Sequence, residues 1–327
     1  MTKSYIRGLG FHVPEHILTN ADFERMVDTS DEWITSRTGI RQRHVAQGET
    51  CSELAQHASL QALEKAGMSA EELSHILVAT FTPDAYIPSA ACTLQHRLGL
   101  SGRYAADLYA ACSGYLYALE TARSLVALHP EANVLTLGSE VISSRTDYTD
   151  RGTCVLFGDG AGAAIVSGAP GHDSAEILDV ILSSDGALGN LLAVRGGGSA
   201  FPYKPGDTIR RDFFVEMQGR EVFRHAVRSM LSVSAEILER NGLTPDEVDV
   251  FIPHQANLRI IEAVGDKVGV PRERIFINVD RYGNTSAAAV AIALAEARIT
   301  GFIKNGDLVL LTAFGGGFTW GAVLLRF

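Results

Sequence analysis

Apolar residues recur along this chain in two alternating patterns, short continuous runs and longer amphipathic stretches. The continuous runs are rich in Val, Ile and Leu, which predicts strands over residues 75–80, 133–138, 249–253 and 307–312. The amphipathic stretches have apolar residues at helical spacing, which predicts helices over residues 52–66, 113–128, 221–241 and 285–302. This alternation favours an α/β fold with mostly parallel, helix-covered sheets that are buried on both faces.

The chain also contains a faint copy of itself. Residues 62–67 (Ala-Leu-Glu-Lys-Ala-Gly) resemble residues 237–242 (Ile-Leu-Glu-Arg-Asn-Gly) at an offset of 175 (242 − 67). The same offset relates 118–119 to 293–294, 122–123 to 297–298, and 134–135 to 309–310. A repeat this long indicates two fused halves rather than a solenoid. We therefore expect an N-terminal half over residues 1–172 and a C-terminal half over residues 173–327, with shared central helices and a loop-rich interruption from about 184 to 216.

Composition restricts the classes of function. The 327-residue chain has 46% hydrophobic residues and only 10 Pro, so it can build a large core. No apolar run reaches membrane-spanning length, the first residues lack a secretory signal, and the four cysteines have neither metal-ligand nor disulfide-framework spacing. We expect a cytoplasmic protein with free thiols, no membrane segment and no metal. The net charge of −10 argues against nucleic acid, and an acidic partner would need a local basic patch.

Cys112 is the first candidate for chemistry. It lies directly before a predicted helix, among small neighbours that would let a substrate approach closely. The N–H groups and positive dipole at a helix start favour a thiolate, so we expect a lowered thiol pKa. The alternative is that Cys112 is a buried structural cysteine. From its local sequence alone, we give the reactive and the structural interpretation about equal weight. For Cys51, Cys92 and Cys154 the structural role is favoured.

The second half supplies further polar candidates. His254 follows a predicted strand and precedes a helix, a position where catalytic and ligand-binding residues collect. Asn284 lies in a turn leading into a helix, where a lone Asn would ordinarily serve as a cap or turn residue. The Gly-rich segment 314–321 follows the last predicted strand and suits either an oxyanion site or a tight turn. Its spacing argues against a dinucleotide or phosphate loop.

Taken together, several segments resemble β-ketoacyl-acyl carrier protein synthase III, a family of the thiolase superfamily. They are residues 28–34, 37–41, 111–114, 158–162, 254–259, 282–286 and 315–321, spread over essentially the whole chain. Elongating ketoacyl synthases carry a second histidine where this chain has Asn284. Thiolases carry a second cysteine in the final Gly-rich region, and this sequence has none after Cys154. The resemblance implies duplicated thiolase-like α/β halves that form a layered αβαβα sandwich.

The resemblance also implies a reaction, the decarboxylative Claisen condensation of an acyl-CoA starter (acetyl-CoA or similar) with malonyl-acyl carrier protein, which initiates fatty acid biosynthesis. Cys112 would become acylated, with the N–H groups of Cys112 and Gly316 holding the oxyanion. His254 and Asn284 would stabilise the enolate formed when the malonyl group loses carbon dioxide. The apolar face of Phe314 would disfavour a carboxylate beside the nucleophile. No cofactor is implied, because acyl-CoA is a substrate.

Further residues are assigned to binding by the same resemblance. The coenzyme A and pantetheine path would be lined by Trp33, Arg37, Thr38, Arg151, Gly219, Phe223, Ala256 and Asn257. The carrier protein would dock on Gln255, Ala256, Asn257, Leu258, Arg259 and Arg224. The acyl pocket would be lined by Ile87 and Leu156, and in a homodimer Ile87 would close the pocket of the other subunit. Some acetyl-preferring members carry Phe in place of Ile87, and Tyr109 is larger than the Ala often found there, so starter selection stays open.

Three alternatives remain at this point. A secondary-metabolism relative would use the same Cys-His-Asn site with another acyl acceptor. A cysteine thioester hydrolase would release free acid from acyl-CoA without consuming a malonyl group. A binding scaffold without catalysis is the least favoured, because all three site residues are present. A basic docking patch for a carrier protein favours the condensing enzyme.

Overall fold

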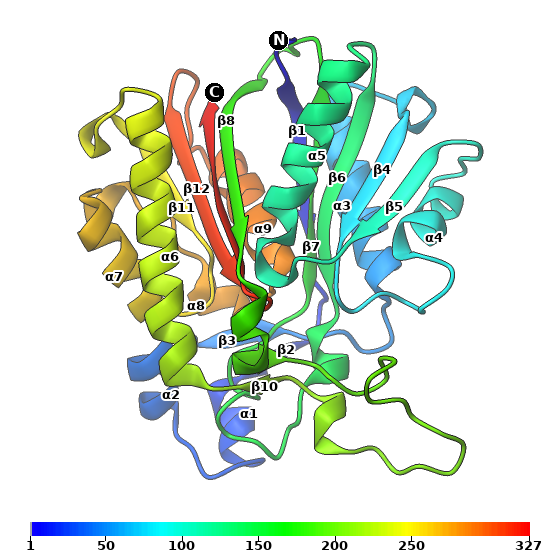
Figure 1. The fold of residues 1–327 in the computed structure, drawn as a ribbon, viewed down its shortest axis with the longest axis vertical. Helices are drawn as coiled ribbons and strands as arrows, with labels where there is room; N and C mark the ends of the chain where they lie inside the picture. The colour runs from blue at the N-terminus through cyan, green and yellow to red at the C-terminus, as the bar shows by residue number, and fades with distance from the viewer. Residues whose placement is uncertain (1) are drawn as a thin grey trace.

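Two sheet halves with helices between and outside them form the framework of the computed structural model, which describes residues 2–327. Within these residues, one sheet has nine strands in the order β11-β12-β13-β8-β1-β7-β6-β4-β5. Its halves meet where β1 pairs with β8 through Tyr5–Glu176 and Ile6–Ala175. Helices α5 and α9 lie between the halves, α3 and α4 cover one outer face, and α6 and α7 cover the other (Figure 1). The expected αβαβα layering is confirmed.

The bounds of the elements follow the apolar pattern closely. The sheet contains β1 (Tyr5–His12), β4 (His75–Ala79), β5 (Tyr104–Leu108), β6 (Asn133–Glu140), β7 (Gly160–Ser167), β8 (Ala175–Ser184), β11 (Val250–Pro253), β12 (Leu308–Gly315) and β13 (Thr319–Arg326). The longer helices are α2 (Asp31–Thr38), α3 (Cys51–Ala66), α4 (Ala90–Arg97), α5 (Gly114–Leu128), α6 (Gly219–Arg240), α7 (Leu258–Val268) and α9 (Ala287–Ile299). Short pieces are β2 (Ile17–Thr19), α1 (Asn20–Glu24), β3 (Gln42–His44) and α8 (Val279–Tyr282). All four expected helices are present.

The expectation of mostly parallel sheets is wrong. The strands predicted from continuous apolar runs, β4, β6, β11 and β12, form the parallel pairs β4–β6 and β11–β12, and β4 also pairs parallel with β5. All other pairings in the large sheet are antiparallel. The strands missing from the prediction include β1, interrupted by Gly8 and Gly10, and β7, which begins Gly-Ala-Gly. Glycine weakens the strand signal because it adds no side chain to pack.

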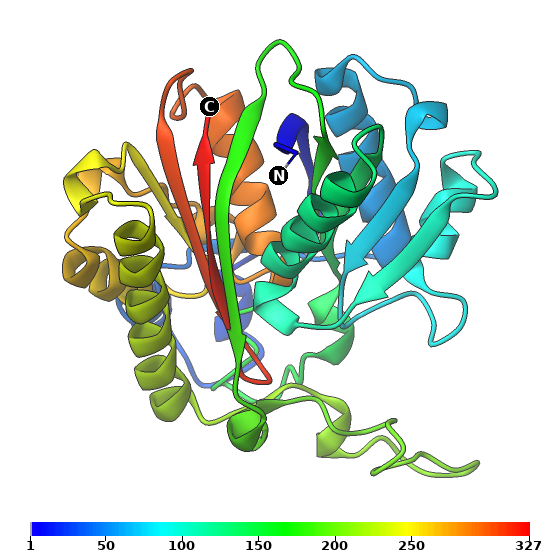
Figure 2. The same cartoon turned by 45° about the horizontal axis from the view of Figure 1, so that its top comes forward.

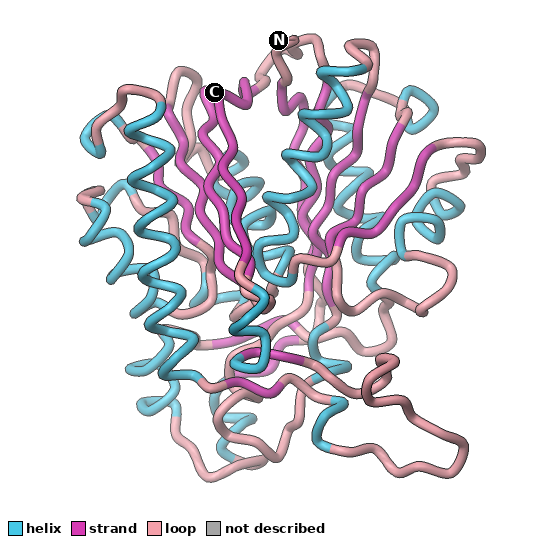
Figure 3. The backbone as a smooth tube through the Cα atoms, viewed as in Figure 1, coloured by secondary structure: helices cyan, strands magenta, loops and turns pink. Residues whose placement is uncertain are grey.

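The two halves correspond element by element at the offset of 175. Strand β6 ends at Glu140 and β12 ends at Gly315, while α5 and α9 occupy matching places in the central layer (Figure 3). The correspondence extends to strained backbone. Within residues 2–327, the two non-glycine residues with positive φ are Ala111 (44°) and Ser286 (49°), and they too are 175 positions apart. The proposed division at 172/173 falls in the turn between β7 and β8, and it stays a prediction.

The central helix α9 packs unusually close to the strands of the first half. Of its 13 residues, the 11 from Ala287 to Ala297 are buried. A Cβ added to Gly138 of β6 would lie 2.2 Å from the carbonyl oxygen of Ala287. A Cβ added to Gly162 of β7 would lie 2.5 Å from the Cβ of Ala291. Glycine in the strands and alanine in the helix therefore set the spacing of these two layers.

The loop-rich segment contains only short elements. The two-residue strands β9 (Leu192–Ala193) and β10 (Glu216–Met217) pair with each other and bring its ends together. The chain between them projects from the body of the molecule, shown in yellow-green in Figure 2. Its first residues, 194–196, also line the main cavity described below.

No helix in residues 2–327 has the length and apolar character needed to cross a membrane.

Candidate active site

Residues from both halves line one cavity of about 1000 Å³. Cys112 comes from the first half, whereas His254 and Asn284 come from the second. Phe314 and Gly316, at the end of β12 and just after it, contribute to the same wall. The structure therefore brings together the five residues assigned to the reaction. A large concave site of this kind at the meeting of two units is the usual place for substrate binding.

The backbone around Cys112 is fixed by direct contact with the second half. Ala111 adopts a φ of 44°, and the short turn Ala111–Ser113 leads into α5. A Cβ added to Gly315 would lie 2.5 Å from the backbone nitrogen of Cys112, so only glycine fits at that point. The Thr319 hydroxyl donates to the carbonyl oxygen of Ala110 at 2.8 Å and reinforces this contact. The peptide N–H of Cys112 thus lies beside the Gly-rich turn, as a two-residue oxyanion site requires.

The pKa of the Cys112 thiol is raised, which is the opposite of our expectation. We expected the helix start to lower the thiol pKa, but burial raises it to about 11. The nearby Ser286 hydroxyl acts in the opposite direction and lowers the pKa of the thiol, whereas the Glu140 carboxylate adds to the increase. A residue that is only 9% exposed loses the water that would solvate its thiolate, so burial favours the neutral thiol. In the free protein, Cys112 is therefore protonated at neutral pH.

His254 is a neutral imidazole with free nitrogens. It lies directly after β11, and its backbone N–H donates to the carbonyl oxygen of Thr312 at 2.8 Å. Burial lowers the pKa of His254 to about 4. Within the described residues, neither Nδ1 nor Nε2 has a hydrogen-bond partner although both are buried. An unpaired polar group in a cavity is costly, so the ring is ready to bond a substrate atom.

Asn284 is held by the turn that precedes α9. Its backbone N–H donates to Leu156 at 2.8 Å, and its Oδ1 accepts the backbone N–H of Ser286 at 2.9 Å. With the oxygen engaged in this way, the side chain offers its NH₂ group to the cavity as a donor. The residue is 8% exposed and so lies inside the molecule rather than at a surface cap.

The mouth of the cavity is aromatic and cationic. The guanidinium carbon of Arg151 lies 4.8 Å from the centroid of Trp33, and that of Arg37 lies 5.8 Å from it. Arg151 donates to the carbonyl oxygen of Asp28 at 2.6 Å, and Asn257 donates to that of Arg37 at 3.1 Å. This arrangement can stack an aromatic base and pair with phosphate.

The residues assigned to binding do not all reach the cavity. Those that line it are Trp33, Arg37, Thr38, Leu156, Gly219, Phe223, Ala256, Asn257 and Arg259. Those outside its lining are Ile87, Arg151, Arg224, Gln255 and Leu258. Gln255 requires a correction, because it is buried and cannot touch a docked protein. Its Nε2 donates to Pro253 at 2.8 Å and its Oε1 accepts from Asn278 at 2.9 Å, so it supports the turn that carries its neighbours.

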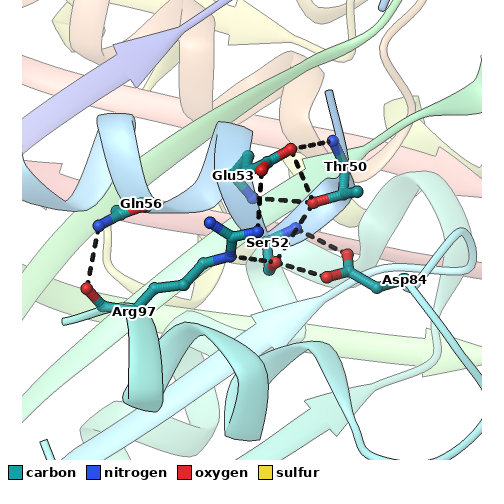
Figure 4. A network of polar contacts seen from close by, with 6 residues as sticks. All are labelled: Thr50, Ser52, Glu53, Gln56, Asp84 and Arg97. Carbon is teal, nitrogen blue, oxygen red and sulfur yellow. Dashed lines mark hydrogen bonds and ion pairs between the residues drawn. The ribbon is translucent and has the colours of Figure 1, made fainter. Parts of the chain in front are cut away.

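Ile87 lies on an exposed apolar loop at the side of the cavity. Ile87 is 89% exposed and Tyr86 is 73% exposed. A polar network anchors this loop (Figure 4). Asp84 accepts the backbone N–H of Ser52 at 2.8 Å, at the start of α3, and Arg97 of α4 donates to the Ser52 hydroxyl at 2.9 Å. The base of the loop is therefore fixed while its apolar tip faces outward.

Two residues near Cys112 escaped the sequence analysis. The Ser286 hydroxyl favours the ionised forms of both the Cys112 thiol and the Glu140 carboxylate, although it makes no hydrogen bond of standard geometry within the described residues. Glu140, at the end of β6, is fully buried. The repeat could have revealed Ser286, because it is the counterpart of Ala111. Nothing in the local sequence marks Glu140.

Among residues 2–327, no group of three or more His, Cys, Asp or Glu side chains is arranged to hold a metal ion.

Comparison with known proteins identifies the family. The family description "3-Oxoacyl-[acyl-carrier-protein (ACP)] synthase III" matches residues 106–186, and its C-terminal counterpart matches residues 238–327. A β-ketoacyl-[acyl-carrier-protein] synthase III of Oleidesulfovibrio alaskensis is 60% identical, with 99% of each chain covered. The chain belongs to the β-ketoacyl-[acyl-carrier-protein] synthase III family.

Solved structures of this family have the same fold. A 3-oxoacyl-[acyl-carrier-protein] synthase III from Aquifex aeolicus matches with a TM-score of 0.91 and 47% identity, covering 99% of this chain and 100% of the other. The priming β-ketosynthase of the R1128 polyketide pathway matches with a TM-score of 0.89 and 34% identity, covering 99% and 96%. The architecture is thus shared with a 3-oxoacyl-[acyl-carrier-protein] synthase III and with a priming synthase of a polyketide pathway.

Because His254 is buried as a neutral imidazole, we predict that the free energy of unfolding decreases in acid. The pKa of His254 is about 4 in the folded chain against an ordinary 6.5, so the unfolded chain binds the extra proton between these values. Stability is complete above pH 6.5 and falls as the pH drops toward 4. At pH 5, His254 should cost about 2 kcal/mol of unfolding free energy relative to pH 7. In urea unfolding, the His254→Gln variant should lose less unfolding free energy between pH 7 and pH 5 than the parent. The exposed control His129→Gln should lose as much as the parent. Equal losses in all three proteins would contradict a neutral buried His254.

Proposed function

We propose that this chain condenses an acyl-CoA starter with malonyl-acyl carrier protein and so initiates fatty acid biosynthesis. The observation that carries the proposal is the convergence of Cys112, His254 and Asn284 in one cavity with a cationic mouth, in a chain 60% identical to a named synthase III. No cofactor takes part, because acyl-CoA is itself a substrate. We place the reaction in the cytoplasm, which suits the free thiols of all four cysteines.

In the first half-reaction, Cys112 attacks the acyl-CoA thioester. The sulfur bonds to the carbonyl carbon and the bond from that carbon to the coenzyme A sulfur breaks. The proton lost by the Cys112 thiol ends on the departing coenzyme A sulfur, and an acyl-enzyme remains. The N–H groups of Cys112 and Gly316 stabilise the oxyanion. Coenzyme A enters past Trp33 and Arg37, where its adenine stacks and its phosphates meet arginine.

In the second half-reaction, malonyl-acyl carrier protein loses carbon dioxide and its enolate attacks the acyl group on Cys112. His254 and Asn284 donate hydrogen bonds to the enolate oxygen. Because the pKa of His254 is lowered to about 4, the imidazole is neutral and does not protonate the carbon nucleophile. Phe314 is buried beside the nucleophile and its ring lies 4.6 Å from that of Phe318, so the leaving carboxylate meets apolar groups.

The carrier protein docks at the mouth of the cavity. Arg220 and Arg259 line the mouth and are exposed, and neither forms an ion pair within the described residues. Arg224 is also exposed but pairs with Glu221, so it contributes less free charge. In a chain of net charge −10, this local positive surface is where an acidic carrier protein would be attracted.

A homodimer completes the acyl pocket. The support is the exposed Tyr86-Ile87 tip, which is apolar, anchored at its base and outside the lining of its own cavity. We propose that Ile87 closes the pocket of the partner subunit, and that Leu156 lines the pocket from within.

A related synthase of secondary metabolism is the second candidate, supported by the 34% identity to the R1128 priming β-ketosynthase. The higher identity to synthase III proteins favours fatty acid initiation. A thioester hydrolase is not favoured, since the burial of Cys112 and His254 keeps water away from the reacting groups. Incubation with an acyl-CoA panel and malonyl-acyl carrier protein tests the three functions together. A β-ketoacyl product supports the proposal, whereas free acid without malonyl consumption overturns it.

The first prediction about activity separates the half-reactions. Asn284→Ala should still be labelled on Cys112 by acetyl-CoA, because only the second half-reaction forms an enolate. Condensation should fall by about 100-fold, the scale of losing one oxyanion donor. Peptide mapping after labelling, with Cys112→Ala as the blank, gives the first quantity, and product formation gives the second. Loss of labelling with normal decarboxylation would reverse the assigned roles.

The second prediction concerns docking. Arg259→Glu should raise KM for malonyl-acyl carrier protein about tenfold and weaken its salt dependence, because an attractive charge becomes repulsive. Acylation of Cys112 by free acetyl-CoA should change little. Arg103→Glu, an exposed charge before β5 on another part of the surface, is the control. The surface is not the dock if Arg259→Glu and Arg224→Glu together leave condensation unchanged.

The third prediction tests the pocket and the assembly. Ile87→Ala should admit longer or branched acyl-CoA starters, because it removes bulk from the pocket of the neighbouring subunit. Light scattering of the parent should give the mass of a dimer. An active enzyme that is strictly monomeric would contradict the shared pocket.

A further inference from the structure

Glu296 is a buried carboxylate that the mechanism above does not use. It lies near the end of α9 and is only 5% exposed. Helix α9 begins at Ala287, directly after the turn that carries Asn284, so Glu296 is roughly 14 Å along the helix axis from that turn. Glu296 does not line the cavity, and any part it takes in the reaction is indirect.

Both oxygens of Glu296 accept hydrogen bonds from the short segment around α8. Tyr282 Oη donates to Oε1 at 2.9 Å, and Asn278 Nδ2 donates to Oε2 at 2.9 Å. Arg281 donates to Oε2 from Nη2 at 3.1 Å and to Oε1 from Nη1. A carboxylate accepts at both oxygens and donates at neither, so it satisfies all of these donors at once.

These bonds close a loop of chain around Asn284. Residues 278–282 are held against the far part of α9, and the chain then runs through the Asn284 turn into the start of the same helix. The backbone of Asn284 is bonded to Leu156 at 2.8 Å and to Gly158 at 3.1 Å. The place of Asn284 therefore depends on how α8 is held to α9 as well as on its own contacts.

Asn278 extends the network to the turn that carries His254. Its side chain bonds Glu296, while its backbone N–H donates to Oε1 of Gln255 at 2.9 Å. The Nε2 of Gln255 donates to the carbonyl oxygen of Pro253, the residue before His254, at 2.8 Å. Asn278 and Gln255 are both buried, where hydrogen bonds are stronger than in water. A continuous path thus connects Glu296 to both turns.

We propose that Glu296 is a positioning residue that sets the distance between His254 and Asn284 for the second half-reaction. The two side chains donate to one enolate oxygen, so their separation must match a single acceptor. The backbone of Cys112 is held by a different contact, with Gly315 after the catalytic histidine and asparagine turns have been placed elsewhere. Glu296 therefore governs decarboxylation and condensation but not acylation. The inference rests on the roles of His254 and Asn284 in the proposed function.

Two variants test this role. Glu296→Gln places an amide NH₂ group against the donors of the α8 segment, which separates that segment from α9. Asn278→Ala removes only the link toward the His254 turn, because Arg281 still bonds Glu296 and the backbone N–H at 278 still reaches Gln255. The double variant measures whether the two positions act through one network.

The matched control is Asp179→Asn. Asp179 of β8 also accepts hydrogen bonds from an arginine and an asparagine, Arg240 Nε at 2.7 Å and Asn241 Nδ2 at 2.8 Å. It does not line the cavity. This variant therefore removes a comparable carboxylate without touching the network around α8.

The readouts are the rate of Cys112 labelling by acetyl-CoA in rapid quench, and kcat and KM for carbon dioxide release from malonyl-acyl carrier protein. In Glu296→Gln, kcat for release should fall about 100-fold, the scale of a displacement of about 1 Å in a site. In Asn278→Ala it should fall about tenfold, and the double variant should be no slower than Glu296→Gln. KM and the labelling rate should change by less than about twofold. Asp179→Asn should behave as the parent in both assays.

Several results would overturn the role of Glu296. They are parental decarboxylation in both variants, equal slowing of labelling and decarboxylation, additive losses in the double variant, and the same selective loss in Asp179→Asn. If Glu296→Gln does not fold, Asn278→Ala decides by the same split between the half-reactions. A parent that releases no carbon dioxide from malonyl-acyl carrier protein overturns the proposed function and this inference together, whereas a normal parent with unaffected variants overturns this inference alone.

Discussion

The burial of two helices between the sheet halves is the constraint on which the rest of the structure depends. Helix α9 has no solvated face along most of its length, so it is composed mainly of alanine and packs against glycine in β6 and β7. Such contacts leave little freedom for the helix to slide or rotate. The turns that precede α5 and α9 are held with the same rigidity. Those turns carry Cys112 and Asn284, so packing far from the chemistry sets the geometry of the site.

Burial also determines the electrostatics of the site. It raises the pKa values of Cys112 and Glu140 and lowers that of His254, so each group is shifted toward its uncharged form. The mouth has the opposite character, with exposed arginines around Trp33. Charged parts of a substrate are thus bound at the entrance. The reacting groups meet in an environment with little water, and there the groups of the protein are mostly uncharged.

Local sequence was sufficient for some features and insufficient for others. Apolar runs located β4, β6, β11 and β12, which form two of the three parallel pairs, and the offset of 175 indicated the duplication. The antiparallel strands β1 and β7 escaped because their glycines weaken the strand pattern. These glycines make room for α3 beside β1 and for α9 beside β7. Family resemblance assigned Cys112, His254 and Asn284, and the fold gathers them in one cavity. The raised pKa of Cys112 could not be predicted, because it depends on burial by distant segments. For the same reason Gln255 looked like a surface residue, although it is buried.

The paired conformations of Ala111 and Ser286 have a consequence for the history of the fold. If two identical subunits once stood where the halves now stand, each would have presented the same strained turn to a common cavity. Gene fusion would then have freed the two turns to diverge. Today one turn carries Cys112 after the strained Ala111, and the other carries Ala287 after the strained Ser286. On this account, the different chemistry of the two halves is the result of that divergence, while the shared backbone angle keeps the original symmetry.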